Sequence, residues 1–391
     1  GPIQFIMSTH YHSIVLGVGS MGSAACYYLA KQGHRVLGLE QFDVSHDRGS
    51  HTGQSRIVRK AYFEHPDYVP LLDRAYHNWR ELEVETNSDI FLRNGLLYAG
   101  DPESMLIKGI HGSASQYQIP IEVYNGSSVK KIFSQFRLPS DCEVIVERDA
   151  GLVYPEKSVQ LYAQQAMVYG AEIHTNEKVI GWEIKKGLIR VDTNLGTYSA
   201  DHLIITAGPW AGQFIPQLNK HLRVTRQTIV WFMPSDMRAF YAERFPCWLI
   251  QDNPGDDIFY GFPVLSARDF GGPIGLKIAQ HNPGDVVEPD QVNRTVSKEE
   301  VEKLEHAISK FIPGGSGRLV SSKTCLYTYT PDENFVVDFL PGTDQKVAVA
   351  CGFSGHGFKF TPVIGEILAD LAIRGKSDLP IGFLNINRIL K

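Results

Sequence analysis

The sequence predicts an α/β protein, because its first forty residues alternate strand, helix and strand. Residues 12–16 form a short apolar run that ends at Gly17, as expected of a buried parallel strand. Apolar side chains then recur at helical spacing over residues 20–32, and Gly33 is the expected end of that helix. A second apolar run over residues 36–39 completes a βαβ unit, the building block of a parallel sheet.

The rest of the chain continues to alternate between the two periodicities. Amphipathic patterns predict helices over residues 66–86, 158–169 and 297–311 and a final helix that begins at Thr361-Pro362. Strand-like runs occupy residues 171–206, 223–233 and 274–280, and the composition of residues 252–257 predicts a turn. No internal repeat or low-complexity linker marks a domain boundary.

Composition excludes several classes of protein. Of the 391 residues, 43% are hydrophobic and 21% are charged, which is typical of a folded globular chain rather than a disordered one. The net charge of −5 argues against nucleic acid as a partner, because proteins that bind phosphate backbones are normally basic. No run reaches the roughly 18 apolar residues of a membrane span, so no membrane partner is expected.

The cysteines and the first residues bear on the cellular compartment. Five cysteines without a closely spaced pair argue against a disulfide framework and against a zinc site, so no metal is expected. Gly1-Pro2 is typical of a cleavage scar, Met7 is the expected native start, and no secretory signal is expected. We therefore expect a cytoplasmic globular protein.

A dinucleotide site is predicted where the first strand meets the first helix. Gly17-x-Gly19-x-x-Gly22 follows a strand, opens a helix and precedes an acidic residue, Glu40, by about twenty positions. The glycines permit a tight turn, a close approach to a pyrophosphate and close helix packing, and the helix N-terminus favours the phosphates. Glu40 suits a ribose hydroxyl, which favours NAD or FAD over NADP. An accidental match remains the alternative, and the motif does not choose between nicotinamide and flavin.

Three blocks further along resemble one family. They are residues 49–59 (GSHTGQSRIVR), residues 324–328 (TCLYT) with Pro331-Asp332-Glu333, and residues 352–359 (GFSGHGFK). In this order they resemble the sarcosine oxidase and L-pipecolate oxidase group of flavin amine oxidases, which includes N-methyltryptophan oxidase. The resemblance extends from Ile14 to Asn387. The chain departs from many members at Thr52, where they have a second histidine, and the segment between Tyr260 and Lys277 looks longer than in bacterial members.

The resemblance implies a two-domain fold of the D-amino-acid-oxidase type. A glutathione-reductase-like, Rossmann-type FAD-binding domain would be discontinuous and would comprise residues 7–88, 146–218 and 318–391. A substrate domain with a mixed or antiparallel sheet would comprise residues 89–145 and 219–317.

The resemblance also implies FAD, attached covalently through a thioether to Cys325. A thiolate is the natural nucleophile for that bond, although a free cysteine is more often a small buried hydrophobe. Beside Gly17, Gly19, Gly22 and Glu40, the implied cofactor contacts are Ser20, Met21, Gln41, Ser50, His51, Thr52, Val179, Ala207, Gly208, Trp210, Gly355, His356, Gly357, Phe358 and Lys359.

Basic residues are the implied catalytic groups, because flavin reduction and oxygen reduction both develop negative charge. By resemblance, Arg59 and Lys359 bind a substrate carboxylate, Lys277 activates oxygen, and Arg56 supports the charge near the flavin. His281 and Tyr260 match residues near the substrate, whereas Tyr260 could equally belong to the core. A lysine or arginine taken alone is most often a solvated surface charge.

The implied function is the oxidation of a secondary amino acid, such as sarcosine, another N-methyl amino acid or L-pipecolate. The C–N bond becomes an imine and oxygen becomes hydrogen peroxide, so a small amino acid and O2 are the expected partners. Two alternatives stay open. A nicotinamide-linked dehydrogenase would use the same glycine-rich turn without flavin colour, and a silent flavin-binding relative would be yellow without turnover.

Overall fold

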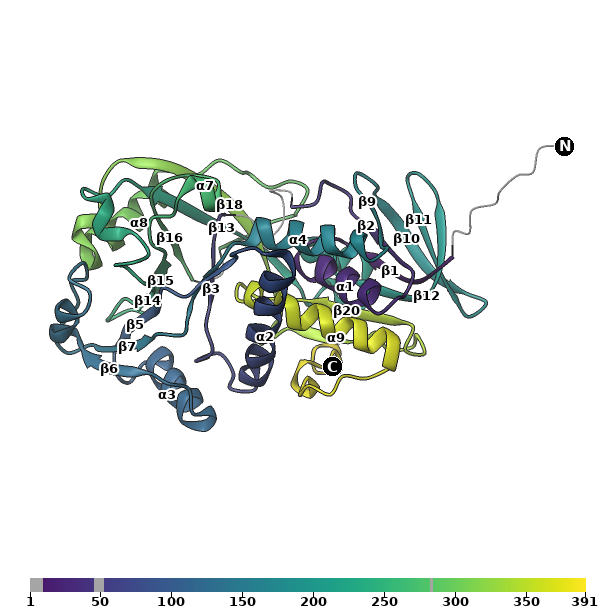
Figure 1. Ribbon diagram of the computed structural model, residues 1–391, viewed down its shortest axis with the longest axis horizontal. Helices are drawn as coiled ribbons and strands as arrows, with labels where there is room; N and C mark the ends of the chain where they lie inside the picture. The colour runs from purple at the N-terminus through teal and green to yellow at the C-terminus, as the bar shows by residue number, and fades with distance from the viewer. Residues whose placement is uncertain (1–9, 46–52, 282–283) are drawn as a thin grey trace.

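The computed structural model describes residues 10–45, 53–281 and 284–391, and its strands form three sheets (Figure 1). The α-helices are α1 (Ser20–Lys31), α2 (Tyr68–Thr86), α3 (Met105–Tyr117), α4 (Pro155–Val168), α5 (Ala211–Phe214), α6 (Pro216–Asn219), α7 (Ala267–Phe270), α8 (Lys298–Phe311), α9 (Thr361–Arg374) and α10 (Asn387–Leu390). Among the residues described, no helix is both long and apolar enough to cross a bilayer.

The first sheet contains the predicted βαβ unit. Its strands are β1 (His10–Leu16), β2 (Val36–Leu39), β9 (Glu172–His174), β10 (Val179–Lys185), β11 (Leu188–Thr193), β12 (Thr197–Ile205), β19 (Val336–Phe339) and β20 (Val347–Cys351). They follow the order β10-β11-β12-β1-β2-β9, with β20 beside the end of β12 and β19 beside β20. β1 is parallel to both neighbours, and Ile14 is level with Leu203 and Leu37. Such a strand is covered on both faces, which explains its unbroken apolar run.

Helices cover one face of this sheet and form its larger core. Val15 of β1 faces the core that includes α1, α2, α4 and α9, whereas Ile14 and Leu16 face the opposite core. α1 lies between α4 and α9 (Figure 1). Gly365 permits the contact of α9 with α1, because a Cβ at this position would lie 2.4 Å from that of Ala24. The start and the end of the chain are therefore packed together.

The second sheet has nine strands and is mostly antiparallel. They are β5 (Leu96–Gly100), β6 (Glu122–Asn125), β7 (Glu143–Glu147), β13 (Arg223–Phe232), β14 (Cys247–Gln251), β15 (Ile258–Gly261), β16 (Leu276–Gln280), β17 (Asp285–Val286) and β18 (Leu319–Tyr329). Their order is β17-β13-β16-β15-β14-β5-β7-β6, with β18 along β13. α8 packs on one face through Leu304, Ile308 and Phe311. Trp231 and Cys325 belong to a different cluster from Val230 and Phe232, so they lie on the other face of the sheet.

A small third sheet connects the two larger ones. It consists of β3 (Arg56–Val58), β8 (Gly151–Val153) and β4 (Phe91–Leu92) in the order β3-β8-β4. β3 lies within the first of the three blocks, residues 49–59, and contains Arg56. α4 begins shortly after β8, at Pro155. Pairing of β3 with β8 brings together segments that are about a hundred residues apart in the sequence.

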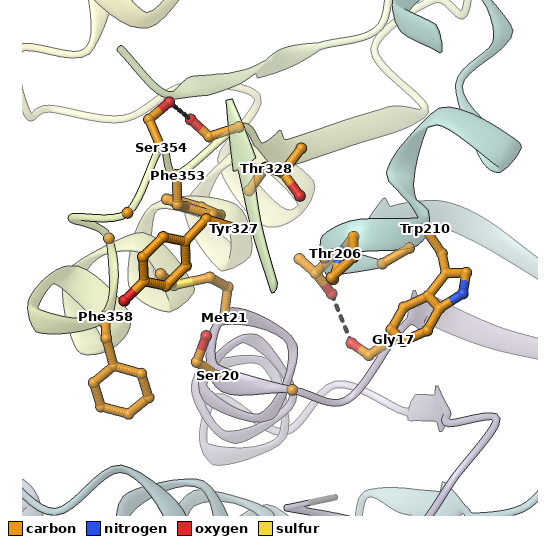
Figure 2. Close-up of a pocket in the computed structure, with 18 of the residues that line it drawn as sticks. Gly17, Ser20, Met21, Thr206, Trp210, Tyr327, Thr328, Phe353, Ser354 and Phe358 are labelled. Atoms are coloured by element: carbon orange, nitrogen blue, oxygen red, sulfur yellow. Dashed lines mark hydrogen bonds between the residues drawn. The ribbon is translucent and has the colours of Figure 1, made fainter. Parts of the chain in front are cut away.

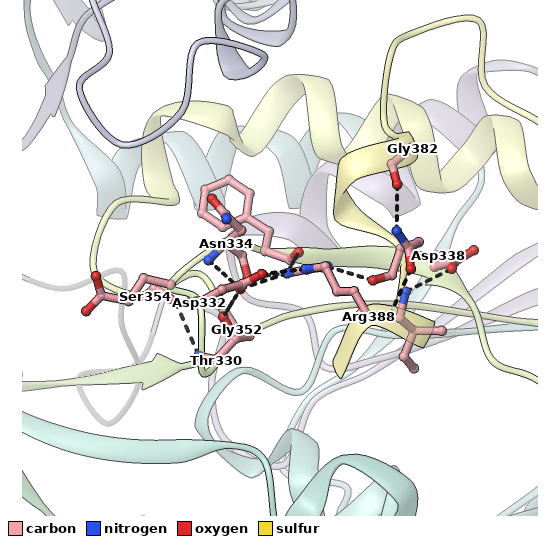
Figure 3. A network of polar contacts seen from close by, with 12 residues as sticks. Thr330, Asp332, Asn334, Asp338, Gly352, Ser354, Gly382 and Arg388 are labelled. Carbon is pink, nitrogen blue, oxygen red and sulfur yellow. Dashed lines mark hydrogen bonds and ion pairs between the residues drawn. The ribbon is translucent and has the colours of Figure 1, made fainter. Parts of the chain in front are cut away.

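A polar network ties α10 to the segments around residues 330–354 (Figure 3). The Arg388 guanidinium in α10 binds the Asp332 carboxylate, with Nε and Oδ2 at 2.8 Å, and donates to the Asn334 carbonyl at 2.8 Å. Asp332 also accepts a hydrogen bond from the Thr330 hydroxyl at 3.1 Å, and the Thr330 amide donates to Ser354 at 3.4 Å. The network thus extends to the third predicted block.

Most of the predicted elements are confirmed, within a few residues. α4 begins at Pro155, three residues before its predicted start, because proline is favourable in the first turn of a helix. Residues 252–257 contain a turn with a cis Asn253-Pro254 bond. The strands and the helix between residues 91 and 147 were not predicted, because their apolar runs are short and irregular.

Candidate active site

A deep pocket is lined by residues of the first two sheets and encloses about 1530 Å³, including its opening to solvent. Figure 2 shows Ser20 and Met21 at the start of α1, with Trp210 on one side of them and Tyr327 and Phe358 on the other.

The glycine-rich turn forms the floor of the pocket. A Cβ at Gly22 would lie 1.8 Å from the Gly17 carbonyl oxygen, so this position accepts only glycine without backbone movement. Gly17 has a φ of +94°, and its carbonyl accepts a hydrogen bond from the Thr206 hydroxyl at 2.7 Å (Figure 2). Thr206 therefore fixes the turn from the neighbouring strand.

The N-terminus of α1 is available to an anion. Among the described residues, no side chain caps this helix, whose N-cap residue is Gly19. Its first backbone amides therefore face the pocket with the positive end of the helix dipole. The Glu40 carboxylate lies nearby at the end of β2 and accepts hydrogen bonds from the Val18 amide at 3.0 Å and the Phe42 amide at 2.9 Å. A carboxylate has about four acceptor sites, so these bonds leave capacity for a ribose hydroxyl.

The block of residues 352–359 forms the opposite wall and leads into α9. Gly355 has a φ of +81°, and its Cβ position would lie 3.1 Å from the Tyr327 ring. The His356 ring is bonded to the Tyr62 hydroxyl and to the Glu333 carbonyl, which lies 2.9 Å from Nε2. Burial lowers the pKa of His356 to about 3, so its ring is neutral at physiological pH.

Two buried cations lie close to one tyrosine ring, that of Tyr62. The Arg59 guanidinium lies 4.2 Å from the Tyr62 ring centroid, and Lys359 Nζ lies 5.2 Å from it. Arg59 and Lys359 are only 3% and 5% exposed. Burial and the Arg59 charge hold the pKa of Lys359 well below its ordinary value. Both residues line the pocket, and buried cations of this kind are chemically suited to bind an anionic group.

Glu64 is paired with one of these cations. Its Oε1 lies 2.7 Å from Arg59 Nη2, while its buried Oε2 has no hydrogen-bond partner in the part of the chain that the structure describes. Burial raises the pKa of the Glu64 carboxyl, but the Arg59 charge outweighs it and lowers the pKa to about 2. Glu64 is therefore a carboxylate at neutral pH. An incoming carboxylate would compete with it for Arg59.

Lys277 lies behind the pocket wall in β16. Its Nζ donates to the Gly53 carbonyl at 2.6 Å, the Ser55 carbonyl at 2.7 Å and the Ser55 hydroxyl at 3.2 Å. Three donated bonds match the three protons of an ammonium group. Burial and the Arg56 guanidinium hold the pKa of Lys277 well below its ordinary value.

Two tyrosines and a histidine line the same pocket as Arg56 and Arg59. The Tyr260 and Tyr327 hydroxyls are 3.2 Å apart, and the His281 ring lies 6.4 Å from the Tyr260 ring, edge to face. Burial lowers the pKa of His281 to about 4, so this imidazole is neutral at physiological pH.

Cys325 is fully buried on β18 and does not line the pocket. Side chains two residues apart on a strand share a face, so Cys325 lies on the same face as Tyr327, which does line it. Cys325 is also within the electrostatic reach of Arg56.

The structure brings most of the predicted site residues together. Those that line the pocket are Gly17, Gly19, Ser20, Met21, Glu40, Gln41, Arg56, Arg59, Val179, Ala207, Gly208, Trp210, Tyr260, His281, Gly355, His356, Gly357, Phe358 and Lys359. Gly22, Lys277 and Cys325 lie behind the lining. Ser50, His51 and Thr52 fall outside the described residues.

Several residues around the pocket were not predicted. The sequence does carry a signal for Tyr327, because strand periodicity puts it on the same face as Cys325. Thr206, Tyr62 and Glu64 have no local signal, since their roles depend on partners that the fold brings to them.

The donor and acceptor groups of the pocket fit a dinucleotide. Gly17 and Gly22 permit the tight turn that leads into α1, the α1 N-terminus supplies amides for a pyrophosphate, and Glu40 supplies an acceptor for a ribose. Gly355 and Gly357 also line the pocket, and glycine lets them pack closely against Tyr327 and Phe353.

Comparison with known proteins agrees with this geometry. Residues 12–371 match the family model for FAD dependent oxidoreductase. Monomeric sarcosine oxidase of Streptomyces avermitilis is 40% identical over 98% of this chain and 99% of its own length. N-methyl-L-tryptophan oxidase of Salmonella dublin is 31% identical over 97% and 99%.

Solved structures show the same fold. NikD, an unusual amino acid oxidase, superposes with a TM-score of 0.83 at 23% identity and covers 96% of this chain and 97% of its own. Glycine oxidase from Geobacillus kaustophilus gives 0.79 at 19% identity, with coverage of 97% and 99%. The expected D-amino-acid-oxidase type of fold is thus confirmed. The chain belongs to the family of FAD-dependent oxidoreductases.

Proposed function

We propose that this protein oxidises a secondary amino acid, such as sarcosine, another N-methyl amino acid or L-pipecolate. The amine C–N bond becomes a C=N bond and O2 becomes H2O2, so two electrons and two protons pass from the amino acid to oxygen. The imine then hydrolyses in water. The observation that carries the proposal is the pair of buried pocket cations, Arg59 and Lys359, in a chain whose relatives include a sarcosine oxidase and an N-methyl-L-tryptophan oxidase.

Arg59 and Lys359 would bind the substrate carboxylate. A guanidinium offers two parallel donors to a carboxylate, and an ammonium adds a point charge. Burial strengthens both contacts because water does not compete for them. Fixing the carboxylate orients the neighbouring C–N bond in the pocket, and positioning of this kind can supply much of a rate enhancement.

The substrate amine must be neutral to give up a hydride equivalent. His281 and Tyr260 line the same pocket and would contact the amine, and the low pKa of His281 keeps it from adding a repelling charge. We expect the rate to rise with pH as the bound amine loses its proton.

FAD, when bound, supplies a two-electron acceptor that oxygen can reoxidise. The α1 N-terminus, Glu40 and the wall of residues 355–359 would hold it. Arg56 lines the pocket and would stabilise negative charge on the cofactor. Lys277 would do so for oxygen as it is reduced. A Lys277→Met variant should keep anaerobic reduction by substrate and lose most oxygen reactivity, and reoxidation at the parental rate would refute this role.

Cys325 would carry the FAD through a thioether. Its position on the face of β18 that also carries Tyr327 supports this assignment. Precipitation with acid should leave yellow colour in the pellet of the parent enzyme and release it from a Cys325→Ser variant. Colour that leaves the parent pellet entirely would refute the covalent bond.

We also propose the predicted division into a FAD-binding part (7–88, 146–218 and 318–391) and a substrate part (89–145 and 219–317). Every strand of the first sheet lies in the former. β18 (Leu319–Tyr329) is shared between the two parts. Its residues fall in the FAD-binding part by number, but it pairs with β13 in the second sheet.

The decisive experiment is a panel of secondary amino acids assayed for peroxide and for anaerobic bleaching of the yellow enzyme. We expect bleaching and peroxide from at least one N-methyl or cyclic amino acid, and none from the corresponding amine without a carboxylate. A yellow enzyme that no member of the panel bleaches would instead be the silent relative.

A further inference from the structure

The segment that leads into β3 contains a tight turn with unusual backbone geometry. The Ser55 amide donates to the Gly53 carbonyl at 2.9 Å, and Gln54, between them, has a φ of +77°. This combination describes a γ-turn of the kind that is rare and strained for a residue other than glycine. Such a turn persists only when neighbouring groups hold it.

The first and last carbonyl groups of the turn, those of Gly53 and Ser55, point at one ammonium group. Lys277 Nζ contacts the Gly53 and Ser55 carbonyls, and Arg56 Nη1 shares the Ser55 carbonyl at 2.8 Å. A Cβ at Gly53, which has a φ of +102°, would lie 3.2 Å from Arg56 Nη1 and 3.7 Å from Lys277 Nζ. The conformation of the turn therefore sets where the Lys277 charge lies.

Glu156 holds the turn from the opposite side. This residue lies in the first turn of α4, and its Oε1 accepts hydrogen bonds from the Gly53 amide at 2.9 Å and the Gln54 amide at 3.1 Å. Its second oxygen, Oε2, is buried and has no hydrogen-bond partner among the described residues. The carboxylate thus binds one side of a peptide segment whose other side binds Lys277.

We propose that Glu156 is a positioning residue for the oxygen half of the reaction, because it fixes the turn of residues 53–55 and supplies the negative charge that keeps Lys277 an ammonium. This inference rests on the proposed function for its effect on oxygen. The coupling of Glu156 to Lys277 itself depends only on the contacts described.

The surroundings of Lys277 explain why it needs such a partner. Burial disfavours its charge, and the nearest charged group that faces it, Arg56, is also positive. Glu156 is the carboxylate that opposes them; the thiols of Cys325 and Cys247 are the other titratable groups that face the ammonium. The Phe262 ring, 4.3 Å from Nζ, and the Trp231 ring, 6.0 Å away, cover it. Neutralising Glu156 should therefore move deprotonation of Lys277 to lower pH.

The test substitutes Glu156→Gln in the holoenzyme. Glutamine keeps an oxygen that can accept both amide bonds and removes the charge. NMR of holoenzyme labelled at lysine Cε and Nζ, with the Lys277 signal assigned by its absence in Lys277→Met, reports protonation without turnover. We expect its titration midpoint to lie at lower pH in Glu156→Gln than in the parent.

Glu83→Gln is the matched control. Glu83 is a buried glutamate, and like Glu156 it accepts hydrogen bonds from two consecutive amides, those of Ile90 and Phe91 at 3.0 and 3.2 Å from its Oε2. It does not contribute to the electrostatic surroundings of Lys277. We expect this variant to leave the Lys277 titration where it is in the parent. A Lys277 signal that behaves alike in Glu156→Gln and the parent would overturn the proposal.

Kinetics then test the consequence for oxygen. At pH 8, reoxidation of the reduced enzyme should be roughly three- to tenfold slower in Glu156→Gln, as expected when a neighbouring charge no longer favours the ammonium. In a Lys277→Met background the same substitution should change the rate less than about twofold, because interacting residues are non-additive. An equal loss in both backgrounds would show that Glu156 acts by another route.

Two failures can be told apart. If Lys277→Met reoxidises like the parent, the proposed role of Lys277 in oxygen chemistry is wrong, while the NMR titration still decides whether Glu156 controls its proton. If Glu156→Gln does not fold, Glu156→Asp replaces it. The shorter side chain withdraws the charge, so it should move the midpoint less but in the same direction, and no movement would overturn the proposal.

Discussion

The ion pair between Glu64 and Arg59 gives a sharp prediction about ligand binding. Glu64 occupies the guanidinium that a substrate carboxylate would use. Its pKa of about 2, against an ordinary value of 4.5, means that the surrounding cations favour its charged form by about 3 kcal/mol, at ~1.4 kcal/mol per unit. If displacement of Glu64 from Arg59 costs about 2 kcal/mol of this, Glu64→Gln should bind a simple carboxylate ~30-fold more tightly.

The measurement is a titration of the yellow holoenzyme with propionate, followed by the change in flavin absorbance at pH 8. Propionate has a carboxylate and no amine, so contacts of Glu64 with a substrate nitrogen do not enter. Glu366→Gln is a matched control, because Glu366 also pairs with an arginine, Arg74, through two bonds of 2.7 Å, but does not line the pocket. It should leave the dissociation constant unchanged.

An unchanged or weaker affinity of Glu64→Gln for propionate would refute the reasoning. It would mean that Arg59 binds the ligand without giving up Glu64, or that Glu64 is needed to hold Arg59 in place. A parallel titration with a secondary amino acid separates these cases, since loss of orientation would weaken both ligands.

Three further perturbations test other parts of the structure. Gly22→Ala places a methyl group 1.8 Å from the Gly17 carbonyl oxygen, so we expect a colourless protein with a lower flavin-to-protein ratio, whereas Gly112→Ala, which has open space, should bind flavin normally. Arg388→Ala removes charged hydrogen bonds from the C-terminal network and should lower the free energy of unfolding in urea by about 2 kcal/mol; a change below ~0.5 kcal/mol would contradict the importance of that network. The depressed pKa of Glu64 contributes stability that is complete above pH ~4.5 and is lost as pH falls toward 2, so the parent should lose about 2 kcal/mol more than Glu64→Gln between pH 5 and pH 3, and equal losses would refute this.

The parts of the fold that the sequence predicts are those governed by local chemistry. The turn of Gly17, Gly19 and Gly22 needs three glycines at fixed spacing for reasons of sterics, so it is recognisable before any tertiary contact forms. The helix at residues 361–374 is equally local, since Pro362 and Gly375 mark its two ends. Patterns of this kind made β1, α1, β2 and α9 predictable, whereas β19 and β20 of the same sheet were not predicted.

Pairings across long stretches of sequence were not predictable in the same way. Glu156 binds amides about a hundred residues before it, and Lys277 binds carbonyls more than two hundred residues away. The residues next to Glu156 and Lys277 in the sequence do not indicate which groups they bind. The partners come close only when the sheets that bury these charges have formed. The pairing of Glu64 with Arg59 was not predictable either. The two residues are five positions apart, and they meet only because the chain turns between them.

The close packing of α1 and α9 has a consequence for how the enzyme is made. The pocket takes its first wall from residues 16–21 and its opposite wall from residues 350–359, near the two ends of the chain. A ribosome releases these walls in order, and domains fold as they emerge. The nascent chain thus carries an incomplete cofactor site until residues 350–359 have emerged, and FAD capture has to wait for them.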